Sequence, residues 1–381
     1  MKVVLIPIET SVRENDYKLY LAEKLKQNGF NAIVGYKGFI NILCKYLSNY
    51  VYIDKGFHDG VSQKLYKIIK SRSGVIYSLD DEGAIDFEDS HTLYSRYDED
   101  LLRNAEKIFF WGEFQRTLIL NKFPNYAKKL ITTGHPRFFS KFLQNRKNYY
   151  VRDIVQNYSK VVLIVMNCGF GNNKFGDEYI IKNYSSRWPF VKKIIKNDKI
   201  KLKNIENFIN NYKIKLTKKQ LLIIRPHPEE NLSFYEKFES ENILINYSHN
   251  VVDWLKYSDE MYHYDSTVAV ESILMNITTK NLPMQNLDED FMTMLPIKIT
   301  RSNNEQSLKI LSDYFYTTND PVELIISQIK QKKHFNTKGI WKFYYYRIKF
   351  LIRIILGAKL NFKFSPFAKS RLNWKYFVLK Y

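Results

Sequence analysis

The chain has 381 residues, of which 45% are hydrophobic and 26% are charged, and its formal net charge at pH 7 is +20. This length is typical of two globular domains, each large enough to bury a core of its own. No run of about 18 apolar residues occurs, which excludes a spanning helix, and the apolar run at 3–8 is too short for a secretory signal. Cys44 and Cys168 match no metal-ligand spacing, so we expect two packed thiols in a reducing, cytoplasmic compartment.

The first half of the chain alternates short apolar runs with helical patterns. Strands are predicted at 3–8, 31–36, 50–53, 74–79, 107–111 and 130–133, and helices at 15–28, 61–69 and 113–121. Strands separated by helices pair in parallel through right-handed crossovers. The pattern therefore predicts an α/β domain.

A polar stretch rich in Tyr and Asn, from about 144 to 160, interrupts this alternation, and we place a domain boundary there. Further strands are predicted at 161–166, 221–224, 243–245, 260–264 and 278–281, and helices at 251–257, 266–275, 305–316 and 321–331. We expect two Rossmann-like, doubly wound domains, 1–150 and 151–330, facing a central cleft. In such folds the ligand binds at the carboxyl ends of the strands.

The remaining residues, 331–381, form a basic aromatic tail with 13 Lys and Arg residues and no Asp or Glu. Within it, the bulky stretch 341–356 carries four cations, Lys342, Arg347, Lys349 and Arg353. This combination favours an anionic membrane surface, where each cation contributes about 1 kcal/mol. The alternatives are a closing helix that packs on the body, and nucleic-acid binding, for which no recognised module is present. We predict peripheral membrane association and no nucleic acid partner.

The first motif with chemical potential is acidic. Asp80, Asp81 and Glu82 follow the predicted strand 74–79, and Gly83 allows a sharp turn after them. A carboxylate with acidic neighbours can have a raised pKa and can accept a proton from an acceptor hydroxyl. The alternative is a solvated acidic loop, or the cap of the next helix.

The second motif is a rigid turn after the strand 221–224. Arg225 and His227 lie in an Arg-Pro-His-Pro sequence that ends at Pro228. An imidazole there can donate a hydrogen bond to a leaving phosphate, and Arg225 can pair with a phosphate or a carboxylate. A purely structural histidine is the alternative.

Two further motifs follow predicted strands of the second half. Ser266 and Thr267 open a predicted helix, where hydroxyls and main-chain N–H groups can hold a phosphate, although the same residues are ordinary helix caps. Gly169 and Gly171 follow the strand 161–166 and allow close approach of a ligand, although a plain turn explains them equally well.

One more strand-end motif, Gly134-His135-Pro136-Arg137, lies near the expected domain junction. His135 and Arg137 are candidates for contacts with an acceptor substrate or for a hinge. Motifs for a nucleotide-binding P-loop, a zinc protease, a nucleophile elbow and a cysteine cluster are absent from the sequence.

The order of three of these motifs resembles that of the bacterial sialyltransferases and polysialyltransferases. In this chain they are Asp81-Glu82-Gly83, His227-Pro228 and Ser266-Thr267. Over about residues 1–300 the sequence is also similar to bacterial surface carbohydrate biosynthesis proteins and capsule-type Kdo transferases, in the segments 79–83, 110–112, 133–138, 225–228 and 266–271.

The resemblance implies a GT-B fold and a glycosyltransferase. The implied reaction moves a CMP-activated 2-keto-3-deoxy acid sugar (a sialic or other nonulosonic acid, or Kdo) onto a capsule or lipopolysaccharide glycan. By the same resemblance Glu82 is the base, with Asp81 next, and His227, Ser266 and Thr267 contact the CMP phosphate. The segment 276–283 departs from the Gly-Lys-Pro turn that the resemblance leads us to expect.

The donor is a co-substrate, and we expect no metal or other cofactor, because an imidazole, hydroxyls and a helix N-terminus can stabilise the leaving CMP. Arg225 or Arg137 is a candidate partner for the donor carboxylate. The expected acceptor is a glycan or glycolipid at the inner face of the cytoplasmic membrane. The alternatives are a CDP-glycerol-type polymer phosphotransferase, a UDP-sugar epimerase, or a non-catalytic, membrane-bound assembly factor.

Overall fold

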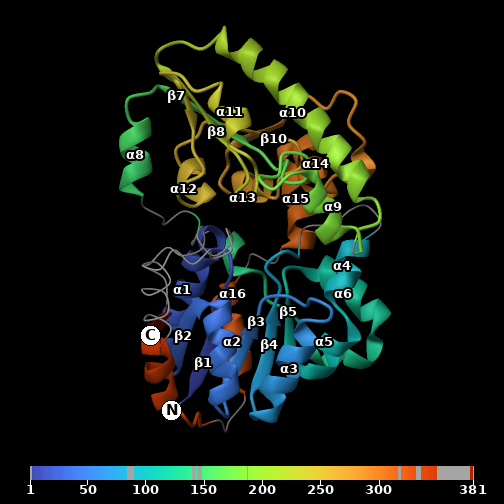
Figure 1. Ribbon diagram of the computed structural model, residues 1–381, viewed down its shortest axis with the longest axis vertical. Coiled ribbons are helices and arrows are strands. Elements are labelled where there is room, and N and C mark those ends of the chain that lie inside the picture. The colour runs from blue at the N-terminus through green and yellow to red at the C-terminus, as the bar shows by residue number, and fades with distance from the viewer. Residues whose placement is uncertain are drawn as a thin grey trace. The chain divides into compact units, whose positions relative to one another are not determined.

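The computed structural model describes residues 2–83, 90–139, 143, 148–186, 188–315, 319–331, 336–349 and 378–380. They form two compact units (Figure 1). The first comprises the described residues of 1–83, 93–139 and 314–381, and the second those of 84–92 and 140–313. The chain therefore leaves the first unit and returns to it, whereas we expected residues 314–330 to belong to the second domain.

The first unit is built on a seven-stranded sheet in the order β12-β2-β1-β3-β4-β5-β6. Six strands are parallel, and β12 is antiparallel to β2. The strands are β1 (Val3–Ile8), β2 (Asn31–Tyr36), β3 (Val51–Asp54), β4 (Val75–Leu79), β5 (Ala105–Phe110), β6 (Leu130–Thr132) and β12 (Val378–Lys380). The helices are α1 (Ser11–Gln27), α2 (Lys37–Tyr46), α3 (Ser62–Ser71), α4 (His91–Arg96), α5 (Glu99–Asn104), α6 (Glu113–Lys122) and α16 (Pro321–Lys330), with 3-10 turns η1 (Pro124–Lys129) and η2 (Pro136–Phe138).

The first sheet is buried on both faces, as expected of parallel strands covered by helices. All residues of β1, β3 and β4 are buried. On one face, Val3 and Leu5 join a core cluster with Phe39 of α2 and Tyr66 of α3. Helices α1 and α16 contact each other and cover the other face (Figure 1).

Helix α16 joins the first unit through contacts with α1 and with the sheet. The hydroxyl of Tyr20 donates to Asp320 at 2.5 Å, just before α16 begins. Lys24 lies 3.3 Å from Glu323, and the hydroxyl of Tyr77 donates to the carbonyl of Gln328 at 3.4 Å. These contacts explain why residues assigned to the second domain from sequence belong with the first unit.

The second unit has a five-stranded parallel sheet in the order β11-β10-β7-β8-β9. Its strands are β7 (Lys160–Val165), β8 (Gln220–Arg225), β9 (Ile243–Ile245), β10 (Glu260–His263) and β11 (Thr278–Asn281). Its helices are α8 (Tyr149–Val155), α9 (Asp177–Tyr184), α10 (Val191–Lys213), α11 (Ser233–Glu236), α12 (Val251–Leu255), α13 (Val268–Leu274), α14 (Met294–Arg301) and α15 (Asn304–Tyr314), with the 3-10 turn η3 (Glu289–Phe291). Its core contains Val162 and Ile164 of β7, Leu222 of β8 and Ile205 of α10.

Part of the basic tail is a helix at residues 341–349. Residues 350–377 lie outside the described residues. The membrane-association expectation for 341–356 can therefore be compared with the structure only over 341–349. Phe343 is buried in the core of the first unit, and the ring of Tyr346 stacks on Tyr46 at 4.2 Å. One face of this segment therefore packs on the first unit, as the closing-helix alternative requires. In the part of the chain that the structure covers, no helix has the length and apolar character needed to cross a membrane.

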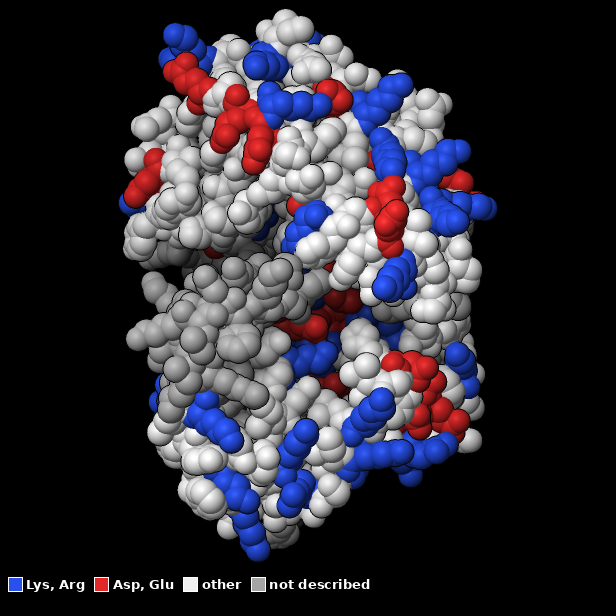
Figure 2. All heavy atoms as spheres, viewed as in Figure 1, with Lys and Arg blue, Asp and Glu red and all other residues white. Residues whose placement is uncertain are grey.

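The surface charge is mixed on the face of the molecule shown in Figure 2. Lys and Arg side chains are spread over both units, and groups of Asp and Glu lie between them. Both cysteines, Cys44 and Cys168, are buried and unpaired with each other. Burial raises the pKa of the Cys44 thiol to about 12, so this side chain behaves as a packed, neutral group.

Candidate active site

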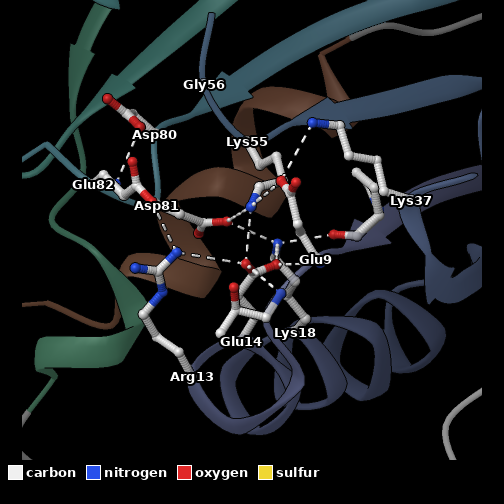
Figure 3. A network of polar contacts seen from close by, with 12 residues as sticks. Glu9, Arg13, Glu14, Lys18, Lys37, Lys55, Gly56, Asp80, Asp81 and Glu82 are labelled. Atoms are coloured by element: carbon white, nitrogen blue, oxygen red, sulfur yellow. Dashed lines mark hydrogen bonds and ion pairs between the residues drawn. The ribbon is translucent and has the colours of Figure 1, made fainter. Parts of the chain in front are cut away.

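Three adjacent strands of the first unit, β1, β3 and β4, end at the same edge of their sheet in charged residues. Glu9 follows β1, Lys55 follows β3, and residues 80–82 follow β4. Helix α1 begins two residues after Glu9 and adds Arg13 and Glu14 to this group. Figure 3 shows these side chains, except that of Asp80, pointing toward one another. The acidic motif read from sequence is thus one part of a larger ionic cluster.

Asp81 lies at the centre of this cluster and is almost completely buried. Its carboxylate accepts hydrogen bonds from Tyr17 and, at 2.9 Å, from Lys18, and Lys55 Nζ lies 3.5 Å away. Burial raises the pKa of Asp81, but the charges of Lys18 and Lys55 and the polar contact with His135 together outweigh this effect and keep the pKa well below its usual range. Asp81 is therefore ionised, fully paired and shielded from solvent.

Glu82 is the more exposed carboxylate of the motif, with 34% of its side chain accessible. Oε1 lies 3.1 Å from Arg13 and Oε2 lies 3.0 Å from Arg96. Burial raises the pKa of Glu82, but the charges of Arg96 and Arg13 lower it to about 2. The expectation of a raised pKa at this motif is wrong, because Arg13 and Arg96, which sequence spacing did not reveal, both contact the Glu82 carboxylate.

Asp80 and Gly83 have structural partners. Arg96 forms a bidentate ion pair with the Asp80 carboxylate, and the Asp80 carbonyl accepts a hydrogen bond from Trp111 Nε1 at 2.7 Å. The carbonyl of Gly83 accepts from Gln115 at 2.6 Å. A Cβ at Gly83 would lie 3.3 Å from the Trp111 ring, so the glycine lets the turn pack on this indole.

Glu14 links the first turn of α1 to the end of β1. It accepts from the main-chain N–H groups of Glu9 and Thr10, both at 3.0 Å, and pairs with Lys18 at 2.7 Å and Lys55 at 2.8 Å. Its side chain is fully buried. Such a carboxylate, satisfied by four donors, fixes the orientation of both lysines that neutralise Asp81.

The expected substrate residue His135 is buried in the first unit, beside Asp81. Its Nδ1 accepts from the main-chain N–H of Arg137 at 3.2 Å, and its Nε2 lies 3.6 Å from Asp81. Burial lowers the pKa of the His135 imidazole, so the ring is neutral. The ring centroid is 4.9 Å from that of Tyr17 and 4.8 Å from that of Trp111, which holds His135 behind the cluster.

The sequence motifs of the second unit lie at the ends of three adjacent parallel strands, β10, β7 and β8. Residues 265–267 follow β10, residues 167–171 follow β7, and residues 226–230 follow β8. The structure therefore brings Gly169, His227 and Ser266 to one edge of one sheet.

His227 is exposed, and its position is defined by its neighbours. Its main-chain N–H donates to Glu230 at 3.0 Å, and its Nδ1 accepts from the main-chain N–H of Glu229 at 3.3 Å. A Cβ at Gly169 would lie 3.3 Å from this Nδ1, so the β7 loop and the imidazole are in close contact. Because Nδ1 accepts, a neutral ring carries its proton on Nε2.

Arg225 has a different environment from the one expected. Its guanidinium is buried and donates to the carbonyls of Ser248 at 2.8 Å and His249 at 2.6 Å. Burial lowers the pKa of Arg225 to about 10. Arg225 therefore fixes the loop that follows β9, a role that sequence did not indicate.

Gly171 is required by packing against α10. A Cβ there would lie 2.6 Å from the Asp198 Cβ and 2.8 Å from the carbonyl of Ile195. The Asp198 carboxylate accepts from the main-chain N–H groups of Phe170 and Gly171, both at 3.1 Å. These two N–H groups are thus bound by a carboxylate of the protein.

Ser266 and Thr267 precede the seven-residue helix α13. Ser266 is buried, and its Oγ accepts from the main-chain N–H of Val268 at 3.3 Å, while Thr267, the N-cap residue, makes no side-chain cap hydrogen bond. Thr267 is partly exposed. The preceding Asp265 accepts from Asn167 at 2.6 Å and from Lys201 at 2.9 Å, which joins the β10 and β7 loops.

Glu230 joins the β7 and β8 loops. Its Oε1 accepts from the main-chain N–H groups of Cys168 and His227, both at 3.0 Å, and its Oε2 accepts from the Tyr235 hydroxyl. Burial raises the pKa of Glu230 to about 7. This residue holds His227 beside Gly169, and sequence reasoning did not single it out.

Other residues of both clusters were also missed: Arg13, Glu14, Lys18, Lys55, Arg96, Asp198, Lys201 and Asp265. Some signal was present, because Lys18 lies in the predicted helix 15–28, Glu14 comes directly before it, and Lys55 follows a predicted strand. Over the ranges that the structure describes, no group of three or more His, Cys, Asp and Glu side chains is arranged to hold a metal ion.

Some solved structures share this architecture. No family model and no curated protein matches the chain. Among solved structures, S. aureus MnaA with UDP aligns with a TM-score of 0.52 and 12% identity, over 87% of this chain and 96% of that chain. A putative UDP-N-acetylglucosamine 2-epimerase from Listeria monocytogenes aligns with a TM-score of 0.52 and 11% identity, with the same coverage. The fold is GT-B-like.

The expected fold class is therefore confirmed, as an α/β protein with two Rossmann-like parts. The wall teichoic acid polymerase TagF also aligns, with a TM-score of 0.47 and 10% identity, over 87% of this chain and 90% of that chain. Identities this low establish the fold alone. What the GT-B-like protein does has to be argued from its own side chains.

Proposed function

We propose that the chain is a glycosyltransferase that moves a CMP-activated 2-keto-3-deoxy acid sugar onto a bacterial surface glycan at the inner face of the cytoplasmic membrane. The observation that supports this proposal is the edge of the second sheet, where exposed His227 lies beside Gly169, and where Ser266 and Thr267 end the adjacent β10 loop. In open parallel sheets this edge is the usual place for a nucleotide.

His227 acts on the leaving group. Its Nδ1 accepts from Glu229, so a neutral ring carries its proton on Nε2, and this N–H would donate to an anionic oxygen of the donor. When the bond between the sugar C2 and the phosphate oxygen breaks, the electron pair and negative charge go to CMP. A donor aimed at that oxygen is most effective in the transition state.

Glu82 accepts the proton of the acceptor hydroxyl as the new bond to C2 forms. With Arg13 and Arg96 both in contact, its pKa of about 2 makes it a weak base. Arg13 is 27% exposed and is a natural partner for the carboxylate of an acidic sugar. Binding of that carboxylate to Arg13 would free Glu82 from one cation and raise its basicity.

A UDP-sugar epimerase is the second candidate function. It is favoured by the shared fold with MnaA and with the Listeria monocytogenes protein, whose names refer to UDP or to a UDP-sugar 2-epimerase. A CDP-glycerol-type phosphotransferase would use the same sheet edge for its nucleotide. All three proposals assign the nucleotide phosphate to the surroundings of His227, and they differ in the group that is transferred or inverted.

A donor panel tests the proposal. The purified full-length protein is incubated with CMP-sialic acid, CMP-Kdo, UDP-N-acetylglucosamine and CDP-glycerol, each with a glycan acceptor extract, and nucleotide release and sugar epimers are measured. CMP release from an acid-sugar donor supports the proposal. An epimer formed without loss of UDP, or release of CMP from CDP-glycerol only, replaces it with the second or third candidate, and no turnover favours an assembly factor.

Two substitutions separate binding from chemistry. We expect His227→Ala to weaken nucleotide binding, and Glu82→Gln to leave binding intact while turnover falls at least about 100-fold, as for loss of a general base. His249→Asn, at an exposed histidine of the second unit with a positive φ that asparagine tolerates, is the matched control. Unchanged turnover in Glu82→Gln would refute the role of this carboxylate.

A further inference from the structure

The helix at residues 341–349 has one face on the body of the first unit and one face in solvent. Phe343 is fully buried, with its ring 6.4 Å from that of Phe39, and Tyr346 stacks on Tyr46. These two residues are three positions apart and so lie on the same side of a helix.

The opposite side of this helix is a stripe of large apolar side chains, which we call the outer stripe: Trp341, Tyr344, Tyr345 and Ile348. Their exposed fractions are 66%, 48%, 53% and 58%. Positions 341, 345 and 348 follow the helical spacing of four and three residues, so their side chains are neighbours on one line. Large exposed apolar patches mark interaction surfaces on otherwise soluble folds.

Cations lie along both margins of the outer stripe. At 100° per residue, Lys342 and Lys349 fall on one margin and Arg347 on the other. Lys342 Nζ lies 5.5 Å from the ring of Trp341, and Lys349 Nζ lies 5.9 Å from the ring of Tyr345. The whole sequence from 331 to 381 contains no acidic residue. The margins therefore attract anions.

The segment before the helix is fixed to the first unit, so the outer stripe is held in place. The Thr337 hydroxyl accepts from the main-chain N–H of Val3 at 3.1 Å and donates to the carbonyl of Asn49 at 2.8 Å. Lys338 and Ser48 form an isolated antiparallel bridge. A surface held in this way can bind a partner without first ordering the backbone that carries it.

We infer that the outer stripe of residues 341–349 docks onto an anionic lipid bilayer, with its rings and Ile348 at the level of the head groups. Trp and Tyr favour the membrane interface because each has an apolar ring and a polar atom. Long Lys and Arg side chains can bury their stems beside such a stripe and place their charges among anionic head groups. The cations beside the outer stripe thus favour an anionic bilayer as its partner.

Nucleic acid fits the outer stripe less well. Aromatic rings with nearby cations can stack on unpaired bases, but Ile348, which ends the line formed with Trp341 and Tyr345, has no π face to offer. In the sequence that follows, 350–356, aliphatic residues predominate, which again favours lipid. The surface is independent of the proposed reaction, because lipid binding needs neither donor nor acceptor.

The experiment is co-sedimentation of the full-length protein with vesicles of phosphatidylcholine alone, or with one third phosphatidylglycerol. We expect at least tenfold tighter binding to the anionic vesicles, weakened by salt. The triple variant Trp341→Ser, Tyr345→Ser, Ile348→Ser should lose at least tenfold. Its matched control is Tyr149→Ser, Tyr247→Ser, Ile214→Ser, at equally exposed residues of the second unit, and should bind as the parent does.

A charge variant, Lys342→Gln, Arg347→Gln, Lys349→Gln, should lose the preference for anionic vesicles, and Lys192→Gln, Lys196→Gln, Lys203→Gln on α10 should keep it. Urea unfolding confirms that each variant is folded. Equal binding to both kinds of vesicle, or full binding by a folded outer-stripe variant, would overturn the inference. So would a parent protein that ignores vesicles but binds single-stranded RNA or forms dimers through this stripe.

Discussion

Lys18 Nζ lies 2.9 Å from Oδ2 of Asp81, and neither side chain is more than 3% exposed. The two residues come from α1 and from the end of β4, so this ion pair fastens a helix to the edge of the sheet at the candidate site. Taking two charges out of water is costly, and the pair is tolerated because Glu14, Tyr17 and Lys55 satisfy the remaining atoms. The acidic motif is thus part of the folded core as well as of the candidate site.

Removing one partner of this pair should be severely destabilising. In Lys18→Met the Asp81 and Glu14 carboxylates lose a buried counter-ion, and we expect the free energy of unfolding to fall by about 3–5 kcal/mol. The measurement is urea denaturation followed by circular dichroism. Lys237→Ala, which breaks an exposed pair with Glu206, is the control and should change stability by less than about 1 kcal/mol. Equal effects of the two substitutions would contradict this account of the cluster.

Acid should destabilise the first unit through Glu9 and Glu82. The pKa of each is lowered from 4.5 to about 2, because the charges of Lys55 and Lys37 at Glu9, and of Arg96 and Arg13 at Glu82, outweigh the effect of burial. The unfolded chain binds more protons than the folded one between these values, so stability is lost as pH falls from about 4.5 toward 2. Thermal unfolding measured across this range should show the loss, and Glu82→Gln should reduce its slope. A variant with the parent's slope would show that Glu82 is not held ionised.

Glu230 should make the stability of the fold depend on pH in the opposite direction. Burial raises its pKa from 4.5 to about 7, so the folded state binds more protons than the unfolded state between these values. Stability should therefore fall as pH rises from about 4.5 to 7, by up to about 3 kcal/mol, and should stay low above that pH. In Glu230→Gln this dependence should disappear. Guanidinium denaturation at pH 5 and at pH 8, in parent and variant, makes the comparison, and an unchanged difference between the two pH values would disprove the assignment.

The two glycines of the β7 loop should respond differently to alanine. A Cβ at Gly171 would meet α10 at 2.6–3.0 Å, so Gly171→Ala should cost about 1–3 kcal/mol of stability. At Gly169 the nearest atom is His227 Nδ1 at 3.3 Å, on a side chain that can move. Gly169→Ala should change stability by less than about 1 kcal/mol and weaken nucleotide binding several-fold. If Gly169→Ala binds nucleotide as the parent does, the imidazole is not held in place by this contact.

The alternation of apolar runs was sufficient to predict the sheets, because buried parallel strands leave an unmistakable run of Val, Ile and Leu. Strands 3–8, 31–36 and 243–245 were predicted to the residue. Helix α10 was missed, since its Lys-rich and Asn-rich sequence hides an apolar face that includes Ile194, Ile205 and Ile209. The short antiparallel strand β12 was also missed, because three residues at the end of a basic tail give no periodic signal.

The candidate site was predictable only in part. Polar residues directly after predicted strands were found, because the strand-end rule depends on local order alone. Arg96, which lowers the pKa of Glu82, comes from a separate helix that only the fold brings near, and the burial that raises the pKa of Glu230 is also a property of the fold. For the same reason the role of Arg225 could not be predicted, because the carbonyls to which it donates belong to the loop after a different strand.

The late return of α16 to the first unit has a consequence for biosynthesis. Tyr20 on α1 is separated by 300 residues from Asp320, its hydrogen-bond partner at the start of α16. At translation rates of about 5–20 residues per second, a ribosome needs about 15–60 s to bridge that interval. During this time the whole of the second unit emerges, so the nascent amino-terminal half stays incomplete while the later half can already collapse, and a chaperone that shields α1 would be most useful in that window.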